Sequence, residues 1–312
     1  MSTGSEIGVL APGVVRESPL PAHWKKRGRF LDLVDLDGDA LLARAFGIEG
    51  TLPAPAPLHY LGATGREPRG YCLFAYPVYL HARREQLILM AGREFEPTEA
   101  ESRVLVARLQ EHFPDWRVER TADGMWFVMV DADPQLETSA LRDVLGENIN
   151  DHLPSGPDAM EWHRILNEVQ MLLFDSEVNC EREAAGSPAL NSLWFWGGGR
   201  LPDVTISRWN RVVSNDPVAL GIGRRAGIDT RQMTEPSFDV QVPDGESPPQ
   251  RALWVWSPGV EKASPPVFAA HHWGSLEAML RRGTVNQLTL IEPGYGELRI
   301  DSGGTRPWWR PW

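Results

Sequence analysis

Apolar side chains recur at helical spacing in the first half of the chain. Leu105, Leu109 and Phe113 are four residues apart, and this spacing places them on one face of a helix. Thr98 precedes them, and Glu101 follows it by three residues, which is the sequence pattern of a capping box. We therefore predict a helix that begins after Thr98 and buries one face.

A second stretch has apolar residues at spacings of four, three and four, namely Trp162, Leu166, Val169 and Leu173. Its opposite face is polar and carries Asn167, Glu168 and Gln170. Asp158 is a candidate N-cap, and Glu161 completes a capping box. The pattern predicts an amphipathic helix with a buried apolar stripe.

Short apolar runs bounded by turn residues predict strands. The pair Asp123 and Gly124 separates two of these runs and favours a hairpin. The expected strands are 87–90, 116–120, 125–130, 252–256 and 287–291, and further helices are expected at 40–46 and 276–282. Strands mixed with helices in this order predict an α/β or α+β fold, with packed helices on a mixed sheet.

Three parts are expected along the chain. Residues 1–75 are predicted to be an irregular N-terminal segment, 76–202 a domain, and 203–312 a C-terminal α/β segment packed on the same core. Within the first part, the proline-rich run 52–57 is predicted to be an extended surface connection, because proline restricts the residue before it.

Composition narrows the classes of function. The chain has 312 residues, of which 42% are apolar, and a formal net charge of −11. The charge argues against nucleic-acid binding, which depends on basic residues. No run approaches the roughly 20 apolar residues of a membrane helix, and the N-terminus lacks the pattern of a secretory signal. We therefore expect a cytoplasmic protein with no membrane partner. Cys72 and Cys180 lie outside any metal-binding motif, and each is expected to be buried.

The most distinctive segment is 191–202, which we call the Trp-Gly segment. Residues 193–196 favour a strand, and Trp194 and Trp196 are expected on one face because they are two residues apart. Three glycines follow, and glycine permits positive φ and close approach of backbone N–H groups to a ligand. Arg200 comes next and suits a contact with a phosphate or carboxylate.

Two interpretations of the Trp-Gly segment remain open. In one, the glycines form an anion-binding turn for a phosphorylated metabolite. The candidate ligand-binding residues are then Asn179, Arg182, Asn191, Trp194, Trp196, Gly197, Gly199 and Arg200. In the other, the glycines end a core strand, and Asn191 and Arg182 satisfy buried backbone groups and brace it.

Other catalytic patterns are weak. Asp35 and Asp37 resemble the opening motif of haloacid-dehalogenase-type phosphatases, in which the first aspartate is the nucleophile and the second the general acid. Asp39 stands where that motif has threonine, so a solvated acidic turn is the competing interpretation. Gly221 and Gly223 lack the third glycine of a dinucleotide fingerprint and are expected at a helix end.

From about 77 to 202, the chain resembles the signature domain of archaeal-type, 2,3-bisphosphoglycerate-independent phosphoglycerate mutases. The residues that carry the resemblance are Asn179, Arg182, Gly186, Pro188, Asn191, Leu193, Trp194, Trp196, Gly197, Gly199 and Pro202. The stretch 162–173, followed by Val178, Asn179, Arg182 and Glu183, resembles more closely the RpfE-type regulatory proteins of bacteria, which share this signature.

The resemblance to the mutases implies an alkaline-phosphatase-like core, two divalent metals such as Mn or Mg, and a serine nucleophile. The apolar start of the chain has no Asp-Gly pair at the end of a strand, and His271 and His272 lack companion acids. We therefore expect no metal site, and the catalytic residues, if the chain has any, are not identified by the sequence. The leading hypothesis is an RpfE-type regulatory protein that binds a phosphorylated metabolite or a protein partner. The alternatives are an active phosphoglycerate mutase and a phosphatase that uses Asp35 and Asp37.

Overall fold

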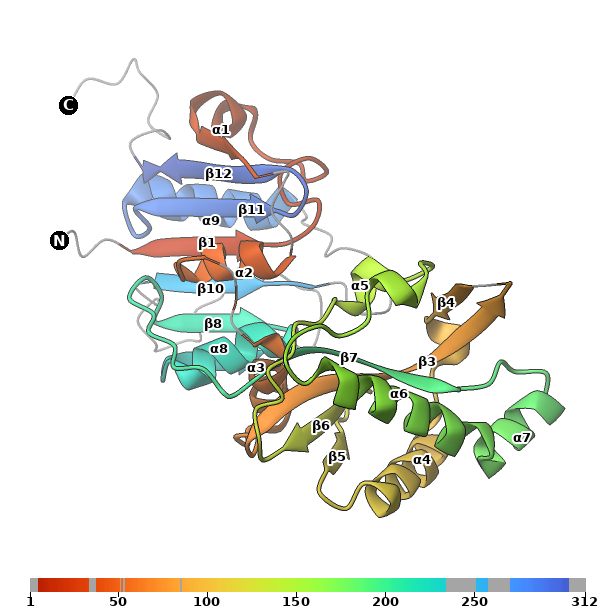
Figure 1. Ribbon diagram of the computed structural model, residues 1–312. Helices are drawn as coiled ribbons and strands as arrows, with labels where there is room; N and C mark the ends of the chain where they lie inside the picture. The colour runs from red at the N-terminus through yellow and green to blue at the C-terminus, as the bar shows by residue number, and fades with distance from the viewer. Residues whose placement is uncertain are drawn as a thin grey trace, which may run out of the picture. The chain divides into compact units, whose positions relative to one another are not determined.

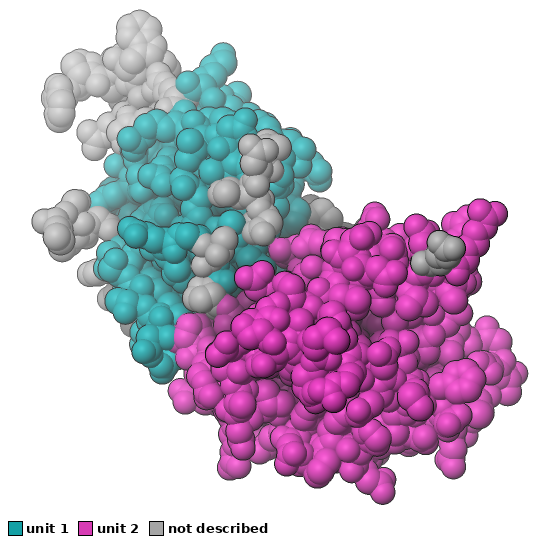
Figure 2. Space-filling model, in the orientation of Figure 1, with its two compact units in different colours: residues 1–52, 203–312 teal, residues 53–202 magenta. Residues whose placement is uncertain are grey.

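Two compact units make up the chain (Figure 2). Unit 1 combines Met1–Leu52 with Asp203–Trp312, and unit 2 is Pro53–Pro202. The computed structural model describes residues 5–33, 38–50, 52, 54–84, 86–233, 251–257 and 270–302. The chain therefore leaves unit 1 once, forms unit 2, and returns to complete unit 1.

Unit 1 contains a seven-stranded sheet in the order β2-β12-β11-β1-β10-β8-β9 (Figure 1). The strands β11, β1, β10, β8 and β9 run parallel to one another, whereas β12 is antiparallel to both β11 and β2. The strands are β1 (Glu6–Leu10), β2 (Arg29–Asp32), β8 (Arg211–Ser214), β9 (Asp229–Gln232), β10 (Arg251–Val255), β11 (Gln287–Glu292) and β12 (Gly296–Asp301). A parallel sheet of this kind needs both faces covered.

Helices cover both faces of this sheet (Figure 1). They are α1 (Ala22–Arg27), α2 (Gly38–Phe46), α8 (Pro217–Arg225) and α9 (Ala270–Arg282). Trp24 of α1 and Trp273 of α9 join one core with alternate residues of β1, β10 and β11. On the opposite face, a Cβ at Gly8 would meet the Trp209 ring at 2.6 Å, and the Trp209 indole donates a hydrogen bond to the carbonyl of Ala45 in α2.

Unit 2 is built on the long strand β3, which pairs with β4, β6 and β7, while β5 pairs with β6. All of these pairings are antiparallel. The strands are β3 (Tyr71–Arg83), β4 (Gln86–Met90), β5 (Arg117–Arg120), β6 (Trp126–Val130) and β7 (Ser192–Gly199). The helices are α3 (Pro55–Thr64), η1 (Arg93–Phe95), α4 (Glu99–His112), α5 (Leu141–Val144), η2 (Ile149–Asp151), α6 (Ala159–Phe174) and α7 (Glu177–Ala184).

Alternation along β7 distributes its side chains between two cores. Leu193 and Phe195 join the core covered by α4 and α6, whereas Trp194 packs on the other side with Val78 and Leu89. Trp196 is half-buried and contacts that same cluster. The prediction that Trp194 and Trp196 share a face is therefore confirmed.

Local patterns correctly predicted the helices α4 and α6 and the strands β4, β5, β6 and β7 of unit 2. The Thr98 capping box is present at the start of α4, with both of its hydrogen bonds. The four apolar residues predicted to form the buried stripe of α6 are all buried. Asp158 precedes α6 but makes no side-chain capping bond, so the second capping box was wrong.

The first 75 residues differ from the expected irregular segment. They contain β1, α1, β2, α2, α3 and the start of β3. The run 52–57 is not an extended connection throughout, because α3 begins at Pro55 and its residues Ala56 and Leu58 are fully buried. Proline fits there because the first turn of a helix leaves its N–H groups unpaired. The unit boundaries fall after Leu52 and Pro202.

Two smaller expectations need correction. Gly223 lies inside α8 rather than at a left-handed helix end, and a Cβ there would meet Thr230 Oγ1 of β9 at 2.8 Å. Close packing of the helix on the sheet therefore explains this glycine. Cys72 is buried, as expected, but Cys180 is exposed.

Candidate functional site

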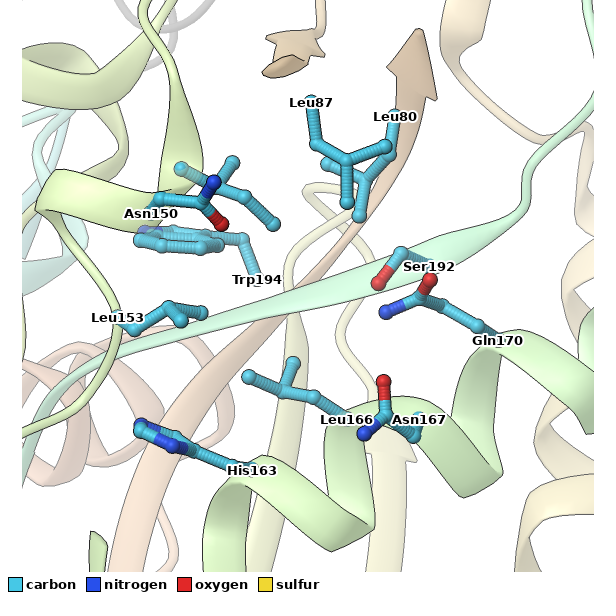
Figure 3. Close-up of a pocket in the computed structure, with 11 residues that line it drawn as sticks. Leu80, Leu87, Asn150, Leu153, His163, Leu166, Asn167, Gln170, Ser192 and Trp194 are labelled. Atoms are coloured by element: carbon cyan, nitrogen blue, oxygen red, sulfur yellow. The ribbon is translucent and has the colours of Figure 1, made fainter. Parts of the chain in front are cut away.

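A cavity of about 250 Å³ opens beside β7 in unit 2 (Figure 3). Side chains from five elements and one loop surround it, among them Leu80, Asn150, His163, Asn167, Gln170 and Trp194. Figure 3 shows them arranged on both sides of the β7 ribbon, with α6 along one side and η2 near Trp194. We call this the β7 pocket.

The amphipathic pattern of α6 explains one wall of the β7 pocket. Leu166 belongs to the buried stripe of the helix, whereas Asn167 is exposed and Gln170 is half-buried. These two amides therefore lie where the apolar face of the helix meets its polar face. The sequence indicated that both residues are on the polar face, but it gave no sign of a cavity there.

His163 fixes the loop that closes the end of the pocket. Its Nε2 lies 2.8 Å from the carbonyl oxygen of Pro154. A carbonyl only accepts, so Nε2 carries a proton and donates it to this contact. The Trp194 indole donates in the same way to the carbonyl of Ser139, at 2.9 Å.

The lining determines which ligand chemistry suits the β7 pocket. Its floor is leucine, isoleucine and tryptophan, and its polar groups are amides, one hydroxyl and one imidazole. Within the described residues, the side-chain amides of Asn150, Asn167 and Gln170 have no protein hydrogen-bond partner. Each amide offers donors and an acceptor. The pocket therefore matches a small, uncharged molecule with an apolar part.

The predicted ligand-binding residue Asn179 lies elsewhere and is buried in α7. Its Nδ2 donates to the carbonyls of Leu173 and Leu190, at 2.8 and 2.9 Å. Its Oδ1 accepts from the N–H of Leu190 at 2.8 Å. The amide therefore ties the end of α6 to the residues that lead into β7, and its hydrogen-bonding capacity is largely used in doing so.

Arg182 performs a similar role one turn further along α7. It is 6% exposed, and its Nε donates to the carbonyl of Pro188 at 2.7 Å. Its terminal nitrogens reach the carbonyl of Glu94 at 3.0 Å and the carboxylate of Glu101 at 3.2 Å. A buried arginine held by backbone carbonyls and one carboxylate connects α7 with η1 and α4.

The Arg182–Glu101 pair predicts a pH dependence. Burial raises the pKa of Glu101, but hydrogen bonds from Thr98 and the charge of Arg182 outweigh burial, so the pKa lies below its ordinary value of 4.5. A carboxylate whose pKa is lower in the folded state than in the unfolded state stabilises the fold at pH values above the unfolded-state pKa. This stabilisation is lost as the pH falls through the folded-state pKa.

We therefore expect the difference in unfolding free energy between wild type and Glu101→Gln to shrink as the pH is lowered from about 6 to about 3. Urea unfolding at several pH values measures this difference. A difference that stays constant over this range would show that the carboxylate is not stabilised by its partners.

Asn191 and the glycines complete the sequence-predicted set. Asn191 Oδ1 accepts from the N–H of Leu80 at 2.7 Å, and its Nδ2 donates to the carbonyl of the same residue at 3.0 Å. The Asn191 side chain thus makes the kind of paired hydrogen bonds to β3 that a backbone residue would make, and it extends the pairing of β7 with β3 by one position. Arg200 is exposed, and it donates to the carbonyl of Asp131 at 2.8 Å.

The expected glycine loop is part of β7 instead, because the strand continues to Gly199. A Cβ at Gly199 would lie 2.3 Å from the Cβ of Ala54, and one at Gly198 would lie 2.6 Å from the Tyr71 ring. Gly197 has φ of +64°, and the register shifts nearby. These contacts favour the bracing interpretation, because neighbouring protein atoms already lie close to the glycines.

The structure thus brings Trp194 of the predicted set into the β7 pocket. The polar members Asn179, Arg182 and Asn191 instead hold α7, η1 and β3 in place around it. Sequence reasoning missed His163 and Asn150 as lining residues. The sequence carried no signal for either residue, because the pocket is assembled from segments that are far apart in the chain.

The carboxyl ends of the parallel strands in unit 1 form the edge at which open α/β sheets bind ligands. Glu292, at the end of β11, is fully buried there and accepts from the N–H groups of Val15 and Arg16 at 2.7 and 2.9 Å. Arg16 Nε also donates to it, at 2.5 Å. Asp216, after β8, caps α8 by accepting from the N–H of Val218 at 2.8 Å. Both carboxylates therefore shape the loops beside the strands.

Metal-ligating side chains do not cluster in the part of the chain that the structure describes. It contains no group of three or more His, Cys, Asp or Glu side chains able to hold a metal ion. Asp35 and Asp37, the candidates for the phosphatase hypothesis, lie outside the described residues, as do the side chains of His271 and His272. Among the described helices, none is both long and apolar enough to cross a membrane.

Sequence comparison places partial similarity in one group of proteins. The chain is 30% identical over 100 residues to a 2,3-bisphosphoglycerate-independent phosphoglycerate mutase of Methanosarcina mazei, which is 30% of this chain and 25% of that protein. The corresponding mutase of Methanothrix thermoacetophila is 37% identical to this chain over 62 residues. The matched segment is 20% of this chain and 16% of that mutase. A probable mutase of Geobacter sulfurreducens is 30% identical to this chain over 92 residues, and this segment is 28% of this chain and 23% of the Geobacter protein.

The similarity therefore spans a quarter or less of the length of these curated relatives. No family model matches the chain. In three dimensions, a cofactor-independent phosphoglycerate mutase of Thermoplasma acidophilum matches with a TM-score of 0.52 and 14% identity, over 96% of this chain and 90% of the other. A Pyrococcus horikoshii protein matches with a TM-score of 0.53 and 10% identity, over 96% and 87%. The expected mixed α/β fold is confirmed. The chain shares the fold of cofactor-independent phosphoglycerate mutases, and over part of its length it is similar in sequence to members of that group.

Proposed function

We propose that the chain is a non-catalytic relative of these mutases, and that it acts as an RpfE-type regulatory protein by binding a small, uncharged ligand in the β7 pocket. The proposal includes that no Mn or Mg ion is required. Function depends on the site and not on the shared scaffold. The similarity in fold to enzymes is therefore compatible with a non-catalytic role.

A contrast in hydrogen bonding carries the proposal. Glu292 and Asp216, at the carboxyl edge of the parallel sheet, accept hydrogen bonds from the loops next to them. Asn167 and Gln170, at the β7 pocket, keep their amides available within the described residues. Polar groups that are available beside an apolar floor are the usual composition of a binding site.

Size and charge indicate the ligand class. The volume of the cavity is about 250 Å³. This is slightly below the usual range for pockets that bind drug-sized ligands, which is roughly 300 to 1,000 Å³. Its lining holds no acidic side chain, lysine or arginine. A phosphorylated metabolite would find no permanent positive charge there, so we assign the pocket to an uncharged molecule.

The test is ligand-observed NMR on the full chain with three uncharged probes: nicotinamide, uridine and N-acetylleucinamide. We expect at least one probe to bind, and Asn167→Ala to weaken it about fivefold, because one hydrogen bond contributes about 1 kcal/mol. Glu168→Ala is the matched control, since Glu168 is the exposed next residue of α6 and does not line the pocket.

Binding that is unchanged in Asn167→Ala, or weakened equally in both variants, would contradict the assignment of the pocket. Absence of binding by all three probes at millimolar concentration would also count against it.

A further inference from the structure

Unit 2 has a second cavity, of about 200 Å³, lined by Tyr60, Arg66, Glu67, Arg69, Arg117 and Met129. Its floor is Tyr60 of α3 and Met129 of β6, which are 2% and 3% exposed and belong to the core beneath α3. This core lies on the sheet face opposite α4 and α6. We call the cavity the arginine pocket.

Two separate segments deliver its arginines, the connection between α3 and β3 and the start of β5. Arg66 follows the left-handed C-cap Gly65 of α3, and its guanidinium lies 5.5 Å from the centre of the Tyr60 ring. Arg69 stands just before β3, and Arg117 is the first residue of β5. The arginines therefore meet only because β5, β6 and α3 fold together.

Glu119 holds two of the arginines in position. Its carboxylate accepts from Arg66 at 2.7 Å, from Arg117 Nε at 2.5 Å and from the Tyr60 hydroxyl at 2.9 Å. Burial raises the pKa of Glu119, but these hydrogen bonds outweigh burial and lower it, so the carboxylate stays ionised. Burial, followed by the bond to Glu119, raises the pKa of Tyr60 to about 12, so its hydroxyl stays a donor.

The donors of the pocket outnumber its acceptors. An arginine carries five N–H groups, and Glu119 accepts through one nitrogen each of Arg66 and Arg117. Within the described residues, the Arg69 side chain has no partner. Three arginines against Glu67 and Glu119 leave a surplus of one positive charge, in a chain whose formal net charge is −11.

We propose that the arginine pocket binds a small phosphate-bearing molecule, a second ligand beyond the one assigned to the β7 pocket. Guanidinium groups form paired, charge-assisted hydrogen bonds with phosphate oxygens. Arg66 and Arg117, held by Glu119, present their remaining N–H groups, and Arg69 supplies the charge that has no internal counterpart. The volume suits a compact molecule of this class.

Pyrophosphate is the probe, measured by calorimetric titration of the full chain at low and at moderate salt. We expect binding that weakens with salt, and a loss of at least about tenfold in Arg69→Gln, since charge-assisted hydrogen bonds contribute about 1.5 to 3 kcal/mol each. Arg103→Gln is the matched control, because it removes the same charge from an exposed position on α4 and should leave the affinity unchanged.

A second variant predicts the opposite direction. Glu119→Gln keeps a side-chain oxygen that accepts from the arginines but raises the surplus of the pocket from one positive charge to two, so pyrophosphate should bind more tightly, provided that thermal unfolding shows the variant to be folded. Equal losses in Arg69→Gln and Arg103→Gln would mean diffuse ion attraction and would overturn the proposal. Undetectable binding by wild type at millimolar pyrophosphate would overturn it as well, without bearing on the uncharged probes of the β7 pocket.

Discussion

Leu166→Ala is expected to lower the free energy of unfolding by about 2 to 5 kcal/mol, because it removes a buried side chain and leaves a cavity. Leu166 is 5% exposed and packs in the core between α6 and the sheet. Glu168→Ala is the control on the exposed side of the same helix. Its contact with the His112 imidazole, at 3.6 Å, joins two side chains that are about half exposed, and exposed polar pairs contribute little.

Denaturant unfolding of the two variants measures both changes. A loss below about 1 kcal/mol in Leu166→Ala, similar to that in Glu168→Ala, would mean that the buried face of α6 is assigned wrongly.

Arg182→Met is expected to destabilise the protein by about 3 to 5 kcal/mol, because breaking a buried ion pair leaves its partners uncompensated. The substitution leaves Glu101 without its cation and the carbonyls of Pro188 and Glu94 without a donor. Methionine keeps much of the apolar volume of the side chain, so the lost polar contacts dominate the change.

Arg164→Met is the matched control. Arg164 is exposed on α6 and pairs with the exposed Glu161, so its loss should change stability by less than about 1 kcal/mol. Chemical unfolding compares the two variants. A small effect of Arg182→Met, similar to that of the control, would favour the original hypothesis that Arg182 serves a ligand and not the fold.

Sequence patterns predicted elements whose determinants lie within one or two turns. The capping box at Thr98 and the stripe of α6 are of this kind, since the residues that define them are close in sequence. The start of α3 was missed for a physical reason. Pro55 and Pro57 are typical of an extended chain, but the first helical turn tolerates proline, and burial of Leu58 makes the helix favourable.

Local sequence patterns could not predict which segments of the chain come together in unit 1. Its first strand, β1, lies between β10 and β11, and both partners come more than 200 residues later in the chain. Parallel pairing across such a separation leaves no periodic signal in either segment. The predicted boundary after residue 75 therefore differs from the unit boundary after Leu52.

The Trp-Gly segment shows a different limit of sequence reasoning. A glycine that approaches a ligand and a glycine that approaches protein atoms have the same sequence signature. The partners that distinguish them, Ala54 for Gly199 and Tyr71 for Gly198, are more than 100 residues away. The β7 pocket is likewise assembled from distant segments, so the sequence revealed the polarity of Asn167 but not its neighbours.

The claim that the chain binds a ligand without catalysing phosphoryl transfer is tested most directly by assaying the full chain for interconversion of 3- and 2-phosphoglycerate. The assay is coupled to enolase and run with Mn²⁺, Mg²⁺, Co²⁺ or Zn²⁺ added in turn. We predict no turnover above the background without protein under any of these conditions. Metal-dependent turnover that stays with the protein through further purification would contradict the account.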